Sequence, residues 1–199
     1  MQEIRVRIPK ERVGVLIGKR GSTKAMIEDI TGAEIIVDSG TGEVLIRFPE
    51  LPEDPLLPMK LESVVRAIGR GFNPEIALKL LEDDYVLEVI DIRRFVGDRK
   101  NALKRMRGRL IGEKGKARAY IEGRTNTHIS VYGHTVSIIG RTYDVVAARE
   151  AVFSLLEGSM HSTAYRVMEK KIAEMSRKAM MDESLMRKAM REVAREEGD

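Results

Sequence analysis

The sequence predicts an α+β protein built from two tandem β-α-α-β-β-α units followed by a C-terminal helix. Two observations predict this fold: an internal repeat at an offset of 94 residues, and the same succession of strand and helix patterns around both copies. A chain of 199 residues, 43% of them hydrophobic, is long enough for two small domains that each bury a modest core. The expected boundaries are residues 1–83 for the first unit with its linking helices, 84–158 for the second unit, and 159–199 for the helical extension.

The repeat is strongest around a pair of Gly-x-x-Gly motifs. Residues 13–37 align with residues 107–131 without a gap, and 11 of these 25 positions are identical, including the glycines of both motifs. Chance does not give this similarity in so short a chain. The sequence therefore predicts one fold made twice.

The elements of the first unit follow from local patterns. Alternating apolar and polar side chains predict a strand over Ile4–Ile8, which leads into a helix, the Gly-x-x-Gly turn and a second helix. Strands are predicted over residues 34–38 and 43–48 with a hairpin turn between them, and a helix over residues 56–71 completes the unit.

The segment that joins the two units has signals of its own. Prolines within residues 49–58 interrupt regular structure, because proline lacks the N–H donor. Asn73 followed by Pro74 fits a helix N-cap and first helical position, so a short linking helix is predicted to begin there.

The second unit repeats the order of the first. A strand over Val86–Phe95 leads into a helix, the second Gly-x-x-Gly turn and another helix. Strands over residues 128–132 and 134–139 form a hairpin at Gly133, and a helix over residues 142–157 ends the unit.

The C-terminal segment is predicted to be one amphipathic helix. Residues 162–197 contain no proline and are rich in Ala, Met, Glu, Lys and Arg. Apolar residues recur on one face at three- and four-residue spacing, with a break at Asp182. They are Met168, Ile172, Met175, Ala179, Met186, Ala189 and Val193. We expect this stripe to dock on one of the units or, failing that, on a partner.

Charge is distributed unevenly along the chain. The net charge is only +4, yet residues 93–118 hold eleven bases and two acids, a balance of +9, whereas residues 49–84 hold eight acids and four bases. A basic block of this kind predicts a local binding site for a polyanion. A solvated helix face is the alternative, although such a face usually mixes both signs.

Composition argues against several other classes of protein. There are no cysteines, and His128, His134 and His161 lack metal-ligand spacing, so no metal site is expected. The P-loop and dinucleotide fingerprints are missing, and no catalytic set stands out, so we expect no enzyme, no cofactor and no small-molecule substrate; a nuclease is the least favoured alternative. Without a long apolar run or a secretory signal, we expect a cytoplasmic protein that does not bind membranes.

The two Gly-x-x-Gly turns are the candidates for the polyanion site. Glycine permits a tight turn and the close approach of another backbone, and the helix that follows offers unpaired N–H groups and the positive end of its dipole. Ile111 and Ile129 would contribute to a groove floor for bases. The candidate binding residues are Gly112, Glu113, Lys114, Gly115, Lys116, Arg107, Arg109, Arg118, Ile111 and Ile129 in the second copy, and Gly18, Lys19, Arg20 and Gly21 in the first. We expect the second copy to dominate affinity, because it lies within the basic block.

These motifs resemble the KH domain of the eukaryotic type (type I), whose Gly-x-x-Gly loop clamps the backbone of about four nucleotides. The resemblance spans residues 1–158. Within it, residues 107–139 are similar to the partner-of-Nob family of archaeal and eukaryotic pre-ribosomal factors. The resemblance implies binding of single-stranded RNA near the 3′ end of small-subunit ribosomal RNA (rRNA) and assistance in its processing. It also implies the Nob endonuclease and the rRNA dimethyladenosine transferase as partners.

One departure from the family pattern bears on the first unit. Eukaryotic members have lost the first loop, whereas this chain keeps Gly18-Lys19-Arg20-Gly21, which favours an archaeal member. Whether the first unit binds RNA or protein stays open. The alternative function is a scaffold, in which KH folds dock proteins in a ribosomal or translation-initiation complex.

Overall fold

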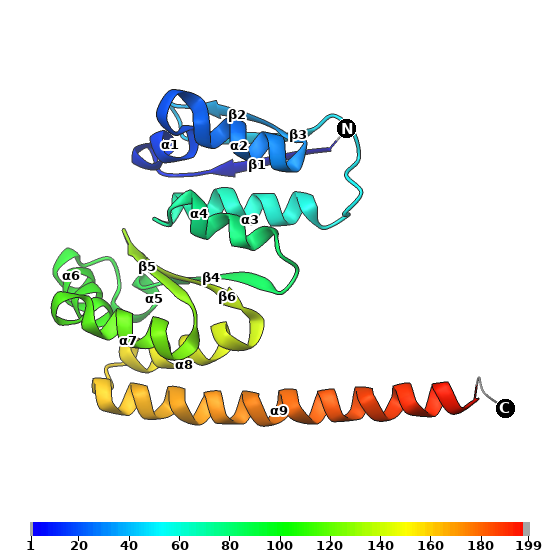
Figure 1. Cartoon of the computed structure of the whole chain (residues 1–199). Helices are drawn as coiled ribbons and strands as arrows, with labels where there is room; N and C mark the ends of the chain where they lie inside the picture. The colour runs from blue at the N-terminus through cyan, green and yellow to red at the C-terminus, as the bar shows by residue number, and fades with distance from the viewer. Residues whose placement is uncertain (1, 197–199) are drawn as a thin grey trace.

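The computed structural model describes residues 2–196, which form two β-α-α-β-β-α units and a long C-terminal helix (Figure 1). The first unit comprises β1 (Gln2–Arg7), α1 (Lys10–Ile17), α2 (Ser22–Thr31), β2 (Glu34–Asp38), β3 (Glu43–Phe48) and α3 (Leu57–Gly69). The second comprises β4 (Tyr85–Asp91), α5 (Arg93–Val96), α6 (Lys100–Ile111), α7 (Lys116–Thr125), β5 (His128–Tyr132), β6 (Thr135–Arg141) and α8 (Thr142–Leu156). Between them lies α4 (Pro74–Ala77), which starts at the predicted proline, and α9 (His161–Glu196) follows the second unit. The predicted α+β fold is confirmed.

Each unit contains an antiparallel three-stranded sheet. The strand order is β1-β3-β2 in the first and β4-β6-β5 in the second, so the first strand of each unit lies beside the last. The second hairpin closes with a turn of only two residues, Gly133 and His134, and Tyr132 pairs with Thr135 across it. Gly133 has a φ of +57°, a left-handed conformation that glycine adopts without strain.

Several identical positions of the repeat are explained by contacts that both units make. The Glu28 carboxylate accepts a hydrogen bond of 2.7 Å from the Ile35 N–H, and the Glu122 carboxylate accepts one of 2.7 Å from the Ile129 N–H. Each bond ties the second helix of a unit to its second strand. The repeat therefore preserves the polar contacts that orient helix and sheet as well as the apolar core.

The two units stack on each other, with α3 and α4 lying between the two sheets (Figure 1). The outer face of the second sheet packs against the first unit, and Ile139 of β6 belongs to the core of that unit. Ser130 Oγ donates a 2.8 Å hydrogen bond to the Arg70 carbonyl, and Tyr132 Oη donates one of 2.9 Å to Glu11. The second sheet is consequently covered on both faces, by its own helices and by the neighbouring unit.

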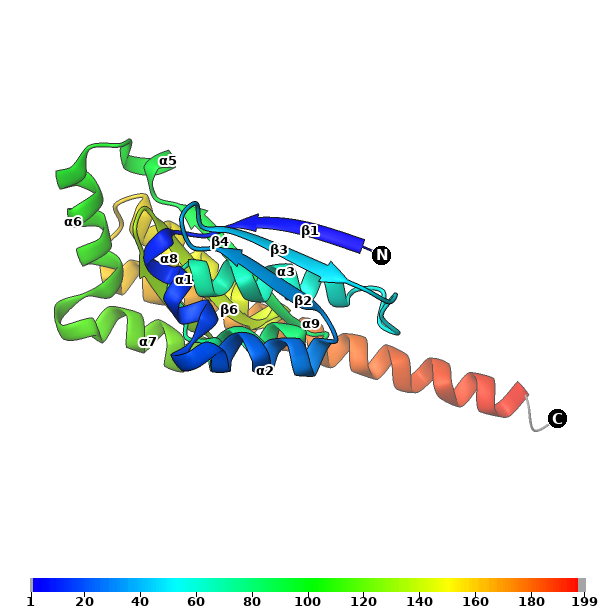
Figure 2. The same cartoon turned by 90° about the horizontal axis from the view of Figure 1, so that it is seen from above.

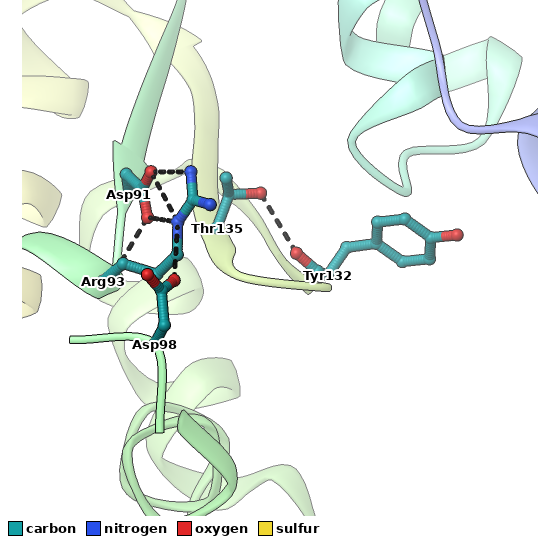
Figure 3. Close-up of polar contacts among 5 residues, drawn as sticks. All are labelled: Asp91, Arg93, Asp98, Tyr132 and Thr135. Atoms are coloured by element: carbon teal, nitrogen blue, oxygen red, sulfur yellow. Dashed lines mark hydrogen bonds and ion pairs between the residues drawn. The ribbon is translucent and has the colours of Figure 1, made fainter. Parts of the chain in front are cut away.

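The prediction of a strand over Val86–Phe95 is wrong at its C-terminal end. The strand stops at Asp91, Ile92 turns to helical dihedral angles (φ −63°, ψ −26°), and α5 follows. Asp91 causes the turn, because its carboxylate accepts a 2.9 Å hydrogen bond from the backbone N–H of Arg93 (Figure 3). The alternating pattern does not reveal this side-chain bond, which ends the strand.

The Asp91–Arg93 pair also holds the start of α5 through side chains. The Arg93 guanidinium donates hydrogen bonds of 3.0 Å and 2.6 Å to the two Asp91 oxygens, and these bonds are the main reason that the pKa of Asp91 falls to about 2. Asp98 lies 3.8 Å from the same guanidinium. Figure 3 shows this cluster beside the hairpin bond from Thr135 Oγ1 to the Tyr132 carbonyl.

The C-terminal helix docks along its first part, as its apolar stripe predicts. Ala164 and Met168 are fully buried against the core of the second unit, and Ile172 packs at its margin. Farther along, Met186 of the predicted stripe is 70% exposed, so docking ends before it. Ala189 and Val193 lie outside the side chains that the structure describes, which end at residue 187. In Figure 1 the C-terminal half of α9 extends beyond α8.

Candidate nucleic-acid interface

The two Gly-x-x-Gly turns have the same backbone conformation. In the second unit Gly112, Lys114 and Gly115 have φ values of +74°, +52° and +80°. The corresponding residues of the first unit have φ values of +75°, +55° and +81°. A lysine or arginine in the left-handed region is uncommon, so each turn carries local strain between two helices.

The first glycine of each turn is required by close packing as well as by its φ. A Cβ atom on Gly112 would lie 2.6 Å from the Ala117 Cβ, and one on Gly18 would lie 2.2 Å from Thr23 Oγ1. The second glycines, Gly21 and Gly115, have open space where a Cβ would be, and only their positive φ requires glycine. The turn therefore brings the two helices together without side chains in between.

The turns present exposed charged side chains at the start of the helices that follow them. Lys19, Arg20, Glu113 and Lys114 are all exposed, and within the described part of the chain none of them forms an ion pair. The helix that follows Gly115, α7, begins without a side-chain cap, as does α2. The N–H of Lys116, its first residue, donates to the Glu113 carbonyl within the turn, so an oxyanion such as a phosphate would meet mainly the positive end of the helix dipole.

The apolar floor differs in part from the prediction. Ile111 is partly exposed next to the turn, as expected of a residue that bases contact. Ile129 is only 6% exposed and belongs to the core of the second unit. It supports the floor from beneath and offers little surface of its own.

The structure does not bring all predicted cations together at the turn. Lys116 is exposed at the start of α7, and Arg118 forms a 3.6 Å ion pair with Glu122. Arg109 points elsewhere: its guanidinium donates a hydrogen bond to the Ser159 carbonyl. Arg109 thereby holds the junction between α8 and α9, away from the turn.

The structure adds exposed apolar residues that the sequence argument did not select. Met26 and Ile30 on α2 and Ile36 on β2 are 40%, 57% and 48% exposed. The repeat alignment contains the signal, because it sets Met26 and Ile30 against Tyr120 and Arg124 of the second unit. At these two positions the first unit has aliphatic side chains, and the second unit has an aromatic and a charged one.

In the second unit α9 engages both of these aligned positions. The ring of Tyr120 lies 4.3 Å from that of Tyr165, centroid to centroid, and Arg124 donates hydrogen bonds of 2.6 Å and 2.7 Å to Glu169. These hydrogen bonds are the main cause of the lowered pKa of Glu169. The same face of the first unit has no such cover from the described part of the chain.

Two further searches concern other kinds of site. Between residues 2 and 196, the described side chains include no group of three or more acidic or histidine residues placed to hold a metal ion. Over the same residues, no helix combines the length and the apolar character needed to cross a membrane.

The unit order, the sheet order and the glycine turn between the first two helices together define a protein with two type I KH domains. Residues 86–173 match a family model described as the eukaryotic type KH-domain (KH-domain type I), and residues 3–53 match a KH domain model.

Relatives specify the family. A KH domain-containing protein of Methanocaldococcus jannaschii is 48% identical over 172 residues, which cover 86% of this chain and 75% of that protein. The pre-rRNA-processing protein PNO1 of Candida glabrata is 29% identical over 170 residues, covering 83% of this chain and 64% of that protein. The chain belongs to the PNO1/Dim2 family of KH-domain proteins.

Solved structures agree with this assignment. Dim2p from Pyrococcus horikoshii is 45% identical and superposes with a TM-score of 0.79, over 85% of this chain and 99% of that chain. A protein of unknown function from Aeropyrum pernix is 42% identical, with a TM-score of 0.88. The match covers 93% of this chain and 98% of that chain. A third match is to the structure of a complex of a/eIF2alpha, aDim2p and rRNA from Pyrococcus horikoshii. It has 44% identity and a TM-score of 0.81, and it covers 87% of this chain and 95% of the matched chain.

Proposed function

We propose that this protein binds single-stranded RNA near the 3′ end of small-subunit rRNA and assists pre-rRNA processing without catalysing a reaction itself. The observation that carries the proposal is the second Gly-x-x-Gly turn, which combines the KH backbone geometry with an exposed Lys114 inside a segment of +9 charge. The family's pre-rRNA-processing member and the rRNA complex of the archaeal relative support the choice of RNA.

The geometry suggests a division of roles within the site. A phosphate would lie over the turn, where the positive end of the α7 dipole and the Lys114 ammonium converge on negative charge. The next bases would contact Ile111. Unstacked bases fit such a groove, whereas the bases of an A-form duplex are hidden in a narrow major groove, so the site favours single strands.

Crosslinking in cell extract, followed by sequencing of the bound RNA, tests the proposed target. We expect crosslinks to gather at the 3′ end of small-subunit rRNA, and purified protein to prefer that strand over a duplex of the same sequence. Crosslinks spread evenly over the ribosomal RNAs, or equal affinity for the duplex, would contradict the proposal.

The Nob endonuclease and the rRNA dimethyladenosine transferase are proposed partners through family membership. A second candidate role is docking of a translation initiation factor, since the archaeal relative occurs in a complex with a/eIF2alpha. The exposed Met26, Ile30 and Ile36 favour protein docking on the first unit. Ile30→Glu would then weaken binding of a/eIF2alpha and leave RNA binding by the second unit unchanged. Unchanged factor binding would exclude this face.

A further inference from the structure

The second unit contains an insert that the first unit lacks. Immediately after the first strand, the Ile8 N–H donates to the Gly42 carbonyl and the Ile92 N–H donates to the His134 carbonyl, so these two isoleucines correspond at an offset of 84 residues. From residue 13, within the first helix, the two units instead align at an offset of 94 residues. Ten residues have therefore been added between Ile92 and the part of α6 that matches α1.

The insert lengthens the first helix of the second unit. The helix α1 has eight residues, whereas α6 has twelve and is preceded by α5. Lys100, Lys104, Arg107 and Ile111 follow one face of α6 at helical spacing, and Ile111 adjoins the Gly-x-x-Gly turn. A cationic stripe thus continues directly from the groove floor.

This stripe forms one wall of a hollow of about 410 Å³. Lys100, Lys104 and Arg107 line it from α6, and Gly133 and His134 of the short hairpin turn line it from the opposite side. In the part of the chain that the structure describes, none of these three cations forms an ion pair. Unpaired cations around a concave surface attract a polyanion from solution. Seen from above, α5 and α6 lie at the outer edge of the molecule (Figure 2).

The first unit has one cation and one acid at this place. Its hairpin turn is four residues long and begins after Asp38, whose pKa is lowered mainly by a hydrogen bond from Thr41, with a further contribution from the charge of Lys10. Lys10, which aligns with Lys104 at the 94-residue offset, therefore has an anionic carboxylate near it, whereas Arg107 aligns with Val13 and Lys100 precedes the part of α6 that matches α1. The stripe of three cations therefore belongs to the second unit, and only Lys104 has a basic counterpart in the first.

We propose that the lengthened helix α6 extends the RNA-binding groove of the second unit, so that Lys100 and Lys104 bind phosphates beyond the nucleotides held by the Gly-x-x-Gly turn. The inference rests on the proposed function and deepens it. From Lys100 to Ile111 the helix rises about 16 Å, which places Lys100 well away from the Gly-x-x-Gly turn and along the path of a longer strand. The second unit would then engage more than the roughly four nucleotides of a KH loop.

Binding of three nested RNA oligonucleotides by the full chain tests the inference. All probes share a 3′-terminal rRNA core of about five nucleotides, which is the whole of the short probe. One long probe extends this core to about ten nucleotides on its 5′ side, and the other extends it to about ten on its 3′ side. The variant is Lys100→Ala with Lys104→Ala. Its matched control, Arg99→Ala with Arg105→Ala, removes two exposed cations of the same segment that do not line the hollow. Thermal melting of each variant checks that the fold is retained.

We expect the wild type to bind one long probe more tightly than the short one. Lys100→Ala with Lys104→Ala should lose roughly tenfold in affinity for that long probe and lower its salt slope by about 1.4, while its affinity for the short probe stays within twofold. Arg99→Ala with Arg105→Ala should lose less than about twofold on both.

Three results would overturn the inference. The first is that affinity rises equally with probe length in the wild type and in the Lys100/Lys104 variant. The second is an equal loss in the control variant, which would mean diffuse attraction without a groove. In both cases, weaker binding of the short probe by Lys114→Asp than by the wild type would still uphold the proposed function. The third is the absence of any such Lys114 defect, which overturns both proposals.

Discussion

Lys114→Asp is expected to weaken binding of a 3′-terminal ribosomal oligonucleotide roughly tenfold or more, and more than Lys19→Asp does. The substitution removes a cation from the place of a phosphate and adds a second acid beside Glu113, so attraction turns into repulsion. The second unit should respond more strongly because its turn lies in the segment with eleven bases. Affinities of both variants, measured on one oligonucleotide at fixed salt, give the comparison.

The salt dependence of the wild type provides an independent check. If phosphates supply most of the attraction, log affinity falls with log salt at a slope near −0.7 per phosphate, roughly −3 for the four nucleotides of one KH loop. If the first unit binds RNA as well, this slope should be steeper. If Lys19→Asp has the larger effect, or neither variant has one, the RNA has been assigned to the wrong unit.

Met168→Ala is expected to lower the free energy of unfolding by about 2–5 kcal/mol. Met168 is fully buried where α9 packs on the second unit, so truncation leaves a cavity and removes apolar contacts. Chemical denaturation of the full chain measures the loss. Deletion of residues 162–199 should lower stability in the same direction.

Met180→Ala is the matched control for this prediction. It makes the same substitution on the same helix, at a side chain that is 70% exposed, and should change stability by less than about 0.5 kcal/mol. Equal effects of the two substitutions, or an unchanged melting curve after the deletion, would mean that α9 is a free arm in solution.

The parts of the fold that depend on local pattern were predictable from sequence. The repeat identified two copies of one unit, and period-two alternation identified the hairpin strands. The glycine turns were predictable for a stronger reason, because the φ of Gly112 and its contact with Ala117 exclude other residues. Lys114 was predictable as an exposed residue, since it stands between two such glycines.

Features that depend on tertiary contacts were not predictable in this way. The strand predicted to run to Phe95 ends at Asp91, whose carboxylate accepts a hydrogen bond from the Arg93 N–H. The sequence predicted that Arg109 would be one more cation near the turn. Its guanidinium instead points to the Ser159 carbonyl, to which it donates a hydrogen bond, 50 residues later in the chain. The floor residue Ile129 required knowledge of which strand face the helices cover.

The covered outer face of the second sheet has a consequence for how the protein forms during translation. Tyr85, Leu87 and Ile139 bury apolar surface against the first unit, so the second unit alone would expose that surface to water and to other chains. Synthesis proceeds from the N-terminus, and the first unit, with α3 and α4, leaves the ribosome before β4 does. The nascent second unit therefore meets a docking surface that is already in place, and its aggregation-prone face is covered as it emerges.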